Sequence, residues 1–196
     1  MEKKEVRAWV KKIIAAMPLE EQALESEKKC KKFLQSPAYK ECDLLLSYMA
    51  MKNECDPLKI NLTSLADNKK LALPRVREKS SFMDFYTISN KKELSLQLQE
   101  GLWGIREPFE NKEHLFECDA SFFQKKICVI VPGLAFTKEG GRLGRGKGFY
   151  DIYLASLLEK ARLCNASVTL LGFCFDCQIL QSIPLSGQDI RMDYVL

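Results

Sequence analysis

Residues 127–154 read ICVIVPGLAFTKEGGRLGRGKGFYDIYL, and this stretch predicts the centre of the fold. It opens with the apolar run 127–131, whose β-branched residues are typical of a strand that is covered on both faces in a parallel sheet. Pro132-Gly133 ends that run, and the apolar pattern from Phe149 to about Leu163 predicts a helix. Between them, residues 140–148 hold five glycines. We call residues 140–148 the glycine segment.

The glycine segment combines backbone flexibility with positive charge. Arg142, Arg145 and Lys147 lie between its glycines. Glycines let backbone N–H groups approach an anion, the start of the following helix adds partial positive charge, and Arg and Lys side chains bind phosphate oxygens. We therefore expect a polyphosphate site, with Asp151 placed where a carboxylate could hold the magnesium that accompanies ATP.

The spacing of the glycine segment does not match a standard P-loop. Positions 141–147 fit the first seven positions of G-x-x-x-x-G-K-[ST], but Gly148 stands where that motif has a magnesium-binding hydroxyl. Two other interpretations stay open from the spacing alone: a flexible basic loop, or an Arg-Gly segment that touches RNA.

The composition is that of an ordinary globular chain of one domain, residues 1–196. Hydrophobic residues make up 46% and charged residues 29% of the sequence, and the net charge of +4 suits an anionic substrate without requiring nucleic acid. No apolar run approaches a membrane span and no signal peptide is evident, so we expect a cytoplasmic protein. We expect the eight cysteines to be reduced thiols rather than disulfides or zinc ligands.

Helical and strand patterns alternate along the rest of the chain. Helical patterns cover 3–16, 19–34, 58–66 and 91–99; strand patterns cover 43–49, 71–74, 83–88 and 168–175; Ser36-Pro37 breaks the second helix, and 109–124 are irregular. This order predicts a three-layer, Rossmann-like α/β fold with a mostly parallel sheet flanked by helices, and with an N-terminal helical pair.

Residues 131–154, VPGLAFTKEGGRLGRGKGFYDIYL, resemble the signature of the 5-formyltetrahydrofolate cyclo-ligase family, also called methenyltetrahydrofolate synthetases. The family pattern is roughly V-P-G-x-A-F-D-x-x-G-x-R-L-G-x-G-x-G-[FY]-Y-D-x-Y-L. Thr137 departs from it, since the family usually has Asp there. The resemblance can be followed from residue 3 to about residue 195, although the family usually continues to a Glu beyond the point where this chain ends.

The resemblance implies an ATP site and a magnesium site. Lys3 and Arg7 match a Lys-x-x-x-Arg that reaches the ATP phosphates in the family. The implied ATP-binding residues are Lys3, Arg7, Gly141, Arg142, Leu143, Gly144, Arg145, Gly146, Lys147, Gly148, Phe149 and Tyr150. Of these, Arg142, Arg145 and Lys147 would stabilise the transferring phosphoryl group and are the implied catalytic residues. Asp151 and Asp189 are the implied magnesium ligands.

The resemblance also implies a folate pocket. Tyr48 and Glu54 match an aromatic residue and a later Glu at the end of a strand, and Trp103 belongs to a W-G-I-x-E-P turn. The implied substrate-binding residues are Tyr48, Glu54, Met83, Trp103, Phe149 and Tyr150. From the residues alone, Tyr48 and Trp103 would be core aromatics and Glu54 a solvated loop carboxylate.

The activity that the resemblance implies is cyclisation of 5-formyltetrahydrofolate, with or without a polyglutamate tail, to 5,10-methenyltetrahydrofolate. ATP would be the co-substrate and Mg²⁺ the cofactor, in a monomer that binds neither membrane nor nucleic acid. Two alternatives stay open. One is a nucleic-acid-binding module that uses the glycine segment and the basic N-terminal helix; the other is a folate- and ATP-binding relative with a different substrate or a storage role.

Overall fold

The structure is a computed structural model that describes residues 2–77, 80–187 and 189–196. Its centre is a six-stranded sheet in the order β11-β9-β6-β1-β2-β3, parallel throughout except for β3, which is antiparallel to β2. These strands are β1 (Leu44–Leu46), β2 (Lys70–Val76), β3 (Met83–Ile88), β6 (Lys126–Val131), β9 (Ser167–Gly172) and β11 (Tyr194–Val195). The prediction of a mostly parallel sheet is confirmed.

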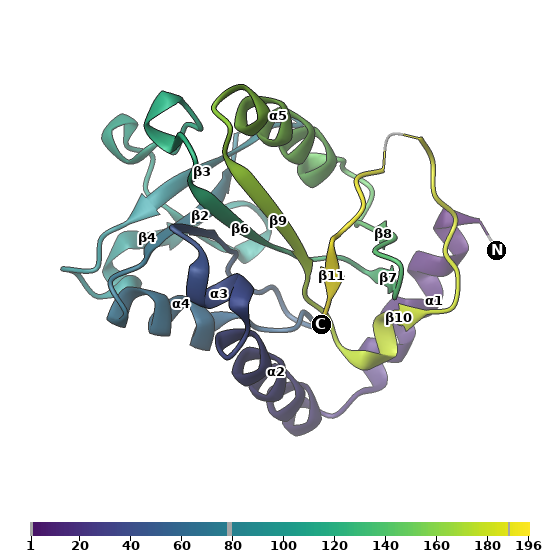
Figure 1. The fold of residues 1–196 in the computed structure, drawn as a ribbon. Helices are drawn as coiled ribbons and strands as arrows, with labels where there is room; N and C mark the ends of the chain where they lie inside the picture. The colour runs from purple at the N-terminus through teal and green to yellow at the C-terminus, as the bar shows by residue number, and fades with distance from the viewer. Residues whose placement is uncertain (1, 78–79, 188) are drawn as a thin grey trace.

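Helices cover both faces of this sheet, giving three layers (Figure 1). Helix α5 (Phe149–Leu163) covers one face. On the other face lie α2 (Leu19–Leu34), α3 (Pro37–Glu41) and α4 (Leu58–Ala66), while α1 (Lys3–Ala16) lies beside the sheet, against β7 (Ala135–Thr137). In the described residues no helix has the length and apolar character needed to cross a bilayer.

The central strands are apolar on both sides because each side faces a helical layer. Leu44 and Leu46 pack in the cluster under α5, whereas Leu45 packs with α1 to α4, and all three are fully buried. Burying one leucine side chain contributes about 1.5–3 kcal/mol to folding. Strand β6 alternates in the same way, which explains why its sequence is a continuous apolar run rather than an alternating one.

Smaller elements surround the main sheet. The short strands are β4 (Leu98–Glu100), β5 (Arg106–Pro108), β7 (Ala135–Thr137), β8 (Arg142–Leu143) and β10 (Ile179–Leu180). The 3₁₀ helices are η1 (Leu94–Gln97), η2 (Leu102–Gly104), η3 (Lys112–His114), η4 (Ala120–Phe122) and η5 (Asp176–Gln178). β7 and β8 form an antiparallel pair, with β10 parallel to β7. Arg142 and Leu143 of the glycine segment therefore form strand β8 rather than loop.

Several predicted elements differ from the structure in type or length. The helix predicted at 91–99 is wrong: a 3₁₀ turn leads there into β4, because Leu98 pairs with Pro108 of β5 and Arg106 Nη2 donates to Ser95 O at 2.7 Å. The strand predicted at 168–175 ends at Gly172. Helix α3 follows the predicted break, since Ser36 Oγ accepts a hydrogen bond from Tyr39 N and starts a new helix.

Candidate active site

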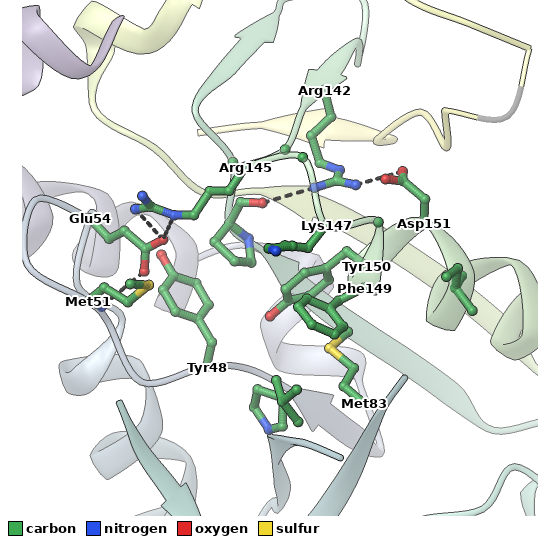
Figure 2. Close-up of a pocket in the computed structure, with 18 of the residues that line it drawn as sticks. Tyr48, Met51, Glu54, Met83, Arg142, Arg145, Lys147, Phe149, Tyr150 and Asp151 are labelled. Carbon is green, nitrogen blue, oxygen red and sulfur yellow. Dashed lines mark hydrogen bonds and ion pairs between the residues drawn. The ribbon is translucent and has the colours of Figure 1, made fainter. Parts of the chain in front are cut away.

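A cavity of about 610 Å³ opens where β1, β2 and β6 end and the glycine segment begins (Figure 2). Ligand sites in open α/β sheets lie at this edge, at the carboxyl ends of the parallel strands. One side is polar and is lined by Arg7, Arg142–Gly148, Asp151, Ser186 and Asp189. The other side is more apolar and is lined by Tyr48, Met49, Met51, Glu54, Pro74, Val76, Met83, Ile105, Arg106 and Glu107.

Two glycines fix the shape of the polar side. The backbone φ angle is 101° at Gly146 and 76° at Gly148, and residues with a Cβ rarely adopt such positive values. Gly148 is the N-cap of α5, so the N-terminal turn of the helix, with its partial positive charge, begins directly after the glycine segment. A Cβ added at Gly146 would lie 3.5 Å from Cζ of Arg7, which shows how closely the N-terminal helix approaches.

Thr137, the departure from the family pattern, stabilises the turn before the glycine segment. Its side chain is buried, and its Oγ1 accepts a hydrogen bond from Gly141 N at 3.1 Å. The backbone N–H of Thr137 donates to Gly141 O at 2.9 Å. A hydroxyl therefore holds the β7–β8 turn through an acceptor function that an aspartate could also perform.

Arg142 is buried between the glycine segment and α5. Its Nη2 donates to Asp151 Oδ1 at 2.6 Å and its Nη1 to Pro132 O at 3.3 Å, while Cζ lies 5.8 Å from the centroid of the Tyr150 ring. In the described residues its Nε has no hydrogen-bond partner. Arg142 thus lines the cavity with its guanidinium already paired to Asp151.

Arg145 and Glu54 connect the two sides of the cavity (Figure 2). Glu54 Oε1 accepts from Nε of Arg145 at 2.9 Å and lies 2.7 Å from its Nη2. Glu54 Oε2 accepts from Met51 N at 3.0 Å, which holds the carboxylate in place. The Glu54 side chain is largely buried, so the interpretation as a solvated loop carboxylate does not hold.

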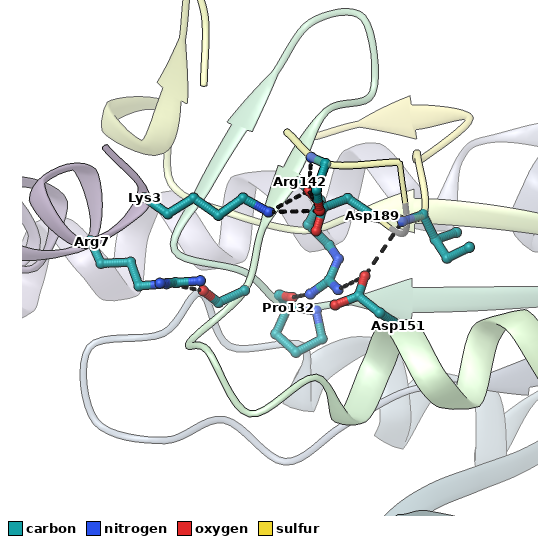
Figure 3. Close-up of polar contacts among 9 residues, drawn as sticks. Lys3, Arg7, Pro132, Arg142, Asp151 and Asp189 are labelled. Atoms are coloured by element: carbon teal, nitrogen blue, oxygen red, sulfur yellow. Dashed lines mark hydrogen bonds and ion pairs between the residues drawn. The ribbon is translucent and has the colours of Figure 1, made fainter. Parts of the chain in front are cut away.

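The N-terminal helix contributes two cations to the polar side (Figure 3). Lys3 Nζ lies 2.6 Å from Asp189 Oδ2 and 3.1 Å from Ser186 Oγ. Burial raises the pKa of Asp189, but hydrogen bonds from Lys3 and Ser186 outweigh it and hold that pKa below its ordinary value. Arg7, one helical turn after Lys3, donates from Nε to Gly144 O at 2.8 Å.

Among the described residues, three cavity-lining cations lack a carboxylate partner: Arg7 and Lys147 on the polar side, and Arg106 on the more apolar side, where it donates to backbone oxygens. Lys147 is exposed, and its side chain lies near Tyr150 and Phe149 (Figure 2). The other three cations near the segment, Lys3, Arg142 and Arg145, are each paired. The polar side of the cavity therefore carries excess positive charge, as a polyphosphate site requires.

Aromatic and sulfur-containing side chains form much of the apolar side. Tyr48 and Met83 are buried, and Tyr48 donates its hydroxyl to Cys55 O. Tyr150 has a buried hydroxyl with no hydrogen-bond partner in the described residues. Burial raises the pKa of both tyrosines, so both hydroxyls stay protonated. Phe149 and Tyr150 begin α5 and line the same cavity.

The cavity also contains residues that the sequence did not single out as site residues. Glu107 is 3% exposed, and its Oε1 accepts from Val76 N at 3.3 Å. Burial raises the pKa of Glu107, although Val76 and Arg75 oppose that shift. The W-G-I-x-E-P resemblance contained this residue, but its place at the cavity depends on β5, which pairs with β4 and lies against β2. The side chain of Trp103 lies outside the described part of the structure.

The predicted magnesium ligands both lie at the cavity, but each is paired with a cation (Figure 3). Asp151 uses Oδ1 for Arg142 and, at 3.4 Å, for Ile190 N. Asp189 uses Oδ2 for Lys3 and Ser186. Within residues 2–77, 80–187 and 189–196, no group of three or more His, Cys, Asp or Glu side chains could hold a metal.

Fold and site together define an α/β protein in which a basic, glycine-rich strand-to-helix connection faces an apolar pocket. The model of the 5-formyltetrahydrofolate cyclo-ligase family matches residues 1–196, and the chain belongs to that family. The predicted family membership is confirmed.

Curated proteins and a solved structure resemble the whole chain. The mouse (Mus musculus) 5-formyltetrahydrofolate cyclo-ligase is 27% identical over 99% of this chain and 92% of its own length. The mitochondrial 5-formyltetrahydrofolate cyclo-ligase of Arabidopsis thaliana is 31% identical over 98% of this chain and 72% of its own. The NMR structure of Aquifex aeolicus 5,10-methenyltetrahydrofolate synthetase has a TM-score of 0.76 at 27% identity, over 100% of this chain and 89% of that one. The interpretation as a nucleic-acid-binding module finds no support here.

Proposed function

We propose that this protein uses ATP to convert 5-formyltetrahydrofolate to 5,10-methenyltetrahydrofolate, releasing ADP and phosphate. The observation that carries the proposal is one cavity with two unlike sides, unpaired cations at the glycine segment and apolar or aromatic side chains opposite. A triphosphate and a flat ring system can meet there, and the names of the relatives support this pair of substrates.

The chemical problem is that a formyl group on nitrogen is a poor electrophile whose oxygen leaves poorly. Transfer of the γ-phosphoryl group of ATP to the formyl oxygen turns that oxygen into a phosphate leaving group. The folate nitrogen at position 10 then attacks the formyl carbon, and phosphate departs. The nucleophiles belong to the substrate, so the protein is needed to position groups and to neutralise charge.

The cations of the polar side are suited to that task. Within residues 2–77, 80–187 and 189–196, Lys147 and Arg7 have no carboxylate to release before they bind phosphate oxygens. Lys3 and Arg145 can exchange a carboxylate for a phosphate, and the N-terminus of α5 adds the partial positive charge of a helix start. We assign Arg142 to holding Asp151 and the segment in place as well as to phosphate, because its guanidinium is buried and paired.

The apolar side is suited to a pterin ring. Tyr48, Met83 and Phe149 offer stacking and sulfur contacts, and we keep Trp103 as a predicted contact. Glu107 is a buried acceptor that can take hydrogen bonds from the amino-pyrimidine edge of the ring. The unpartnered hydroxyl of Tyr150 can donate to a polar atom of the substrate, such as the formyl oxygen.

The carboxylates at the polar side fit a magnesium ion in their chemistry. Mg²⁺ prefers oxygen ligands and takes one or two protein carboxylates together with phosphate oxygens. In the described residues, Oδ2 of Asp151 and Oδ1 of Asp189 accept no hydrogen bond, so each side chain has an oxygen to offer. When bound with ATP, the ion would neutralise charge on the phosphates. Binding by these two residues remains a proposal.

Other properties also remain proposals: a single domain over residues 1–196, a monomer, a polyglutamylated substrate and the absence of nucleic acid as a partner. A cytoplasmic location stays a prediction, and the Arabidopsis relative carries a mitochondrial name.

A direct assay tests the function. Purified protein is mixed with 5-formyltetrahydrofolate, Mg²⁺ and ATP, and the absorbance of the methenyl product is followed. We expect a rise that requires ATP and metal, with one ADP formed per product. A folded protein that forms no product under these conditions, yet binds both ligands, would refute the proposed reaction and favour a binding or storage role.

A further inference from the structure

A second cavity, of about 500 Å³, lies outside the active site, where the C-terminal end of α5 meets the connection before β6. It is lined by Cys118, Asp119, Ala120, Phe123, Lys160, Leu163 and Cys164. Its distinctive feature is a pair of thiols: Sγ of Cys118 lies 3.8 Å from Sγ of Cys164. All eight cysteines are described and free, and no other two have sulfur atoms in contact within the described residues.

The two thiols differ in access and protonation. Cys164 is partly exposed at the C-cap of α5, and its Sγ donates to Lys160 O at 2.9 Å. Cys118 is 8% exposed, and burial raises its pKa to about 11, with the Cys164 thiol adding to that shift. An external reagent therefore reaches Cys164 first, and the more buried Cys118 thiol is placed to react second, with the mixed disulfide formed at Cys164.

We propose that Cys118 and Cys164 form a thiol–disulfide exchange site that accepts a low-molecular-weight disulfide such as oxidised glutathione. Cys164 loses its proton to solvent, its sulfur attacks one sulfur of the reagent, and one thiolate leaves. Cys118 then loses its proton, attacks Sγ of Cys164 and expels the second thiolate. In total, two protein thiols are oxidised to one protein disulfide, and one small disulfide is reduced to two small thiols.

The contact distance makes the second step intramolecular. The two sulfurs already touch, so little chain movement is needed to bring them within bonding distance. The new bond would join residues 46 apart in sequence and would enclose the whole glycine segment and α5. A crosslink of this length restricts the unfolded chain, so the oxidised protein is expected to unfold at a temperature several degrees higher.

The test uses the full chain, reduced and then exposed to oxidised glutathione in mildly alkaline buffer. Intact mass is expected to fall by two hydrogens, and a proteolytic map is expected to link Cys118 with Cys164. Cys118→Ser is expected to gain one glutathionyl group on Cys164 that persists, whereas Cys164→Ser forms no linked pair. Cys177→Ser, which removes a partly exposed cysteine elsewhere, is the matched control and is expected to oxidise like the wild type. A wild type that keeps both thiols, stops at a mixed disulfide or links other cysteines would overturn the proposal.

Discussion

Removing the Lys147 ammonium separates phosphate binding from folding more cleanly than any other change at the site. Lys147 is exposed and forms no ion pair or side-chain hydrogen bond within the described residues, so Lys147→Ala removes no such interaction from the protein without ligand. Surface changes of this kind alter stability by about 0.5 kcal/mol or less. The urea midpoint of the variant is therefore expected to match that of the wild type.

The same change removes a charged hydrogen bond to ATP. Such a bond contributes about 1.5–3 kcal/mol. Because 1.36 kcal/mol corresponds to a tenfold change in rate, kcat/KM for ATP is expected to fall roughly 10- to 150-fold. The assay is formation of the methenyl product at varied ATP, with 5-formyltetrahydrofolate saturating.

Two further variants control this experiment. Lys138→Ala removes an exposed lysine of the β7–β8 turn that does not line the cavity, and it should leave kcat/KM unchanged. Lys147→Arg keeps the charge and should recover part of the activity. Wild-type kcat/KM in Lys147→Ala would refute the assignment, and so would a large loss of stability in that variant.

Three other changes probe the remaining parts of the site. Gly146→Ala forces a Cβ onto a φ of 101° beside Arg7 and should cost about 1–3 kcal/mol of stability in urea titrations; an unchanged midpoint would contradict that backbone strain. The lowered pKa of Asp189 means that its pair with Lys3 stabilises the fold above the pKa of an unfolded aspartate, about 3.9, and loses that effect as pH falls through the lower folded value. Lys3→Met should flatten this part of the stability–pH curve, and an unaltered curve would show the pair to be inert. Glu107→Gln should weaken 5-formyltetrahydrofolate binding about tenfold while leaving ATP binding intact, since the loss of a charged hydrogen-bond acceptor costs roughly 1.5 kcal/mol or more. Because burial raises the pKa of Glu107, its replacement by a neutral side chain should cause no loss of stability at neutral pH. Equal losses of affinity for both ligands would point to a folding role instead.

The sequence predicted the centre of the fold because that part is specified locally. Strand β6 is apolar on both faces, and α5 begins at Phe149, where the helical pattern of the sequence starts. Both signals lie within a few residues of the feature they indicate.

Elements whose structure depends on contacts between residues distant in sequence could not be predicted from local sequence patterns. The helical pattern at 91–99 yields to the pairing of β4 with β5, in which Leu98 lies opposite Pro108. Strands β7 and β8 are too short to show an alternating pattern, yet they convert the start of the glycine segment into a hairpin.

The ion pairs of the site were also invisible in the sequence. Arg145 and Glu54 are 91 residues apart, and Lys3 and Asp189 are 186 apart, so no spacing rule relates them. The resemblance predicted each of these residues separately, as a ligand of ATP, folate or metal. Their pairing with one another requires the folded chain.

The Arg145–Glu54 ion pair has a consequence for how the binding of one ligand changes the affinity for the other. A phosphate that takes Arg145 from Glu54 frees a carboxylate on the folate side, and a folate that takes Glu54 frees a guanidinium on the ATP side. The ligand that binds first therefore breaks the Arg145–Glu54 ion pair, and the second ligand binds without having to break it. By thermodynamic linkage, ATP must raise the affinity for folate by the same factor as folate raises the affinity for ATP. We expect Glu54→Gln to reduce both factors together, so that the two ligands would bind the variant independently.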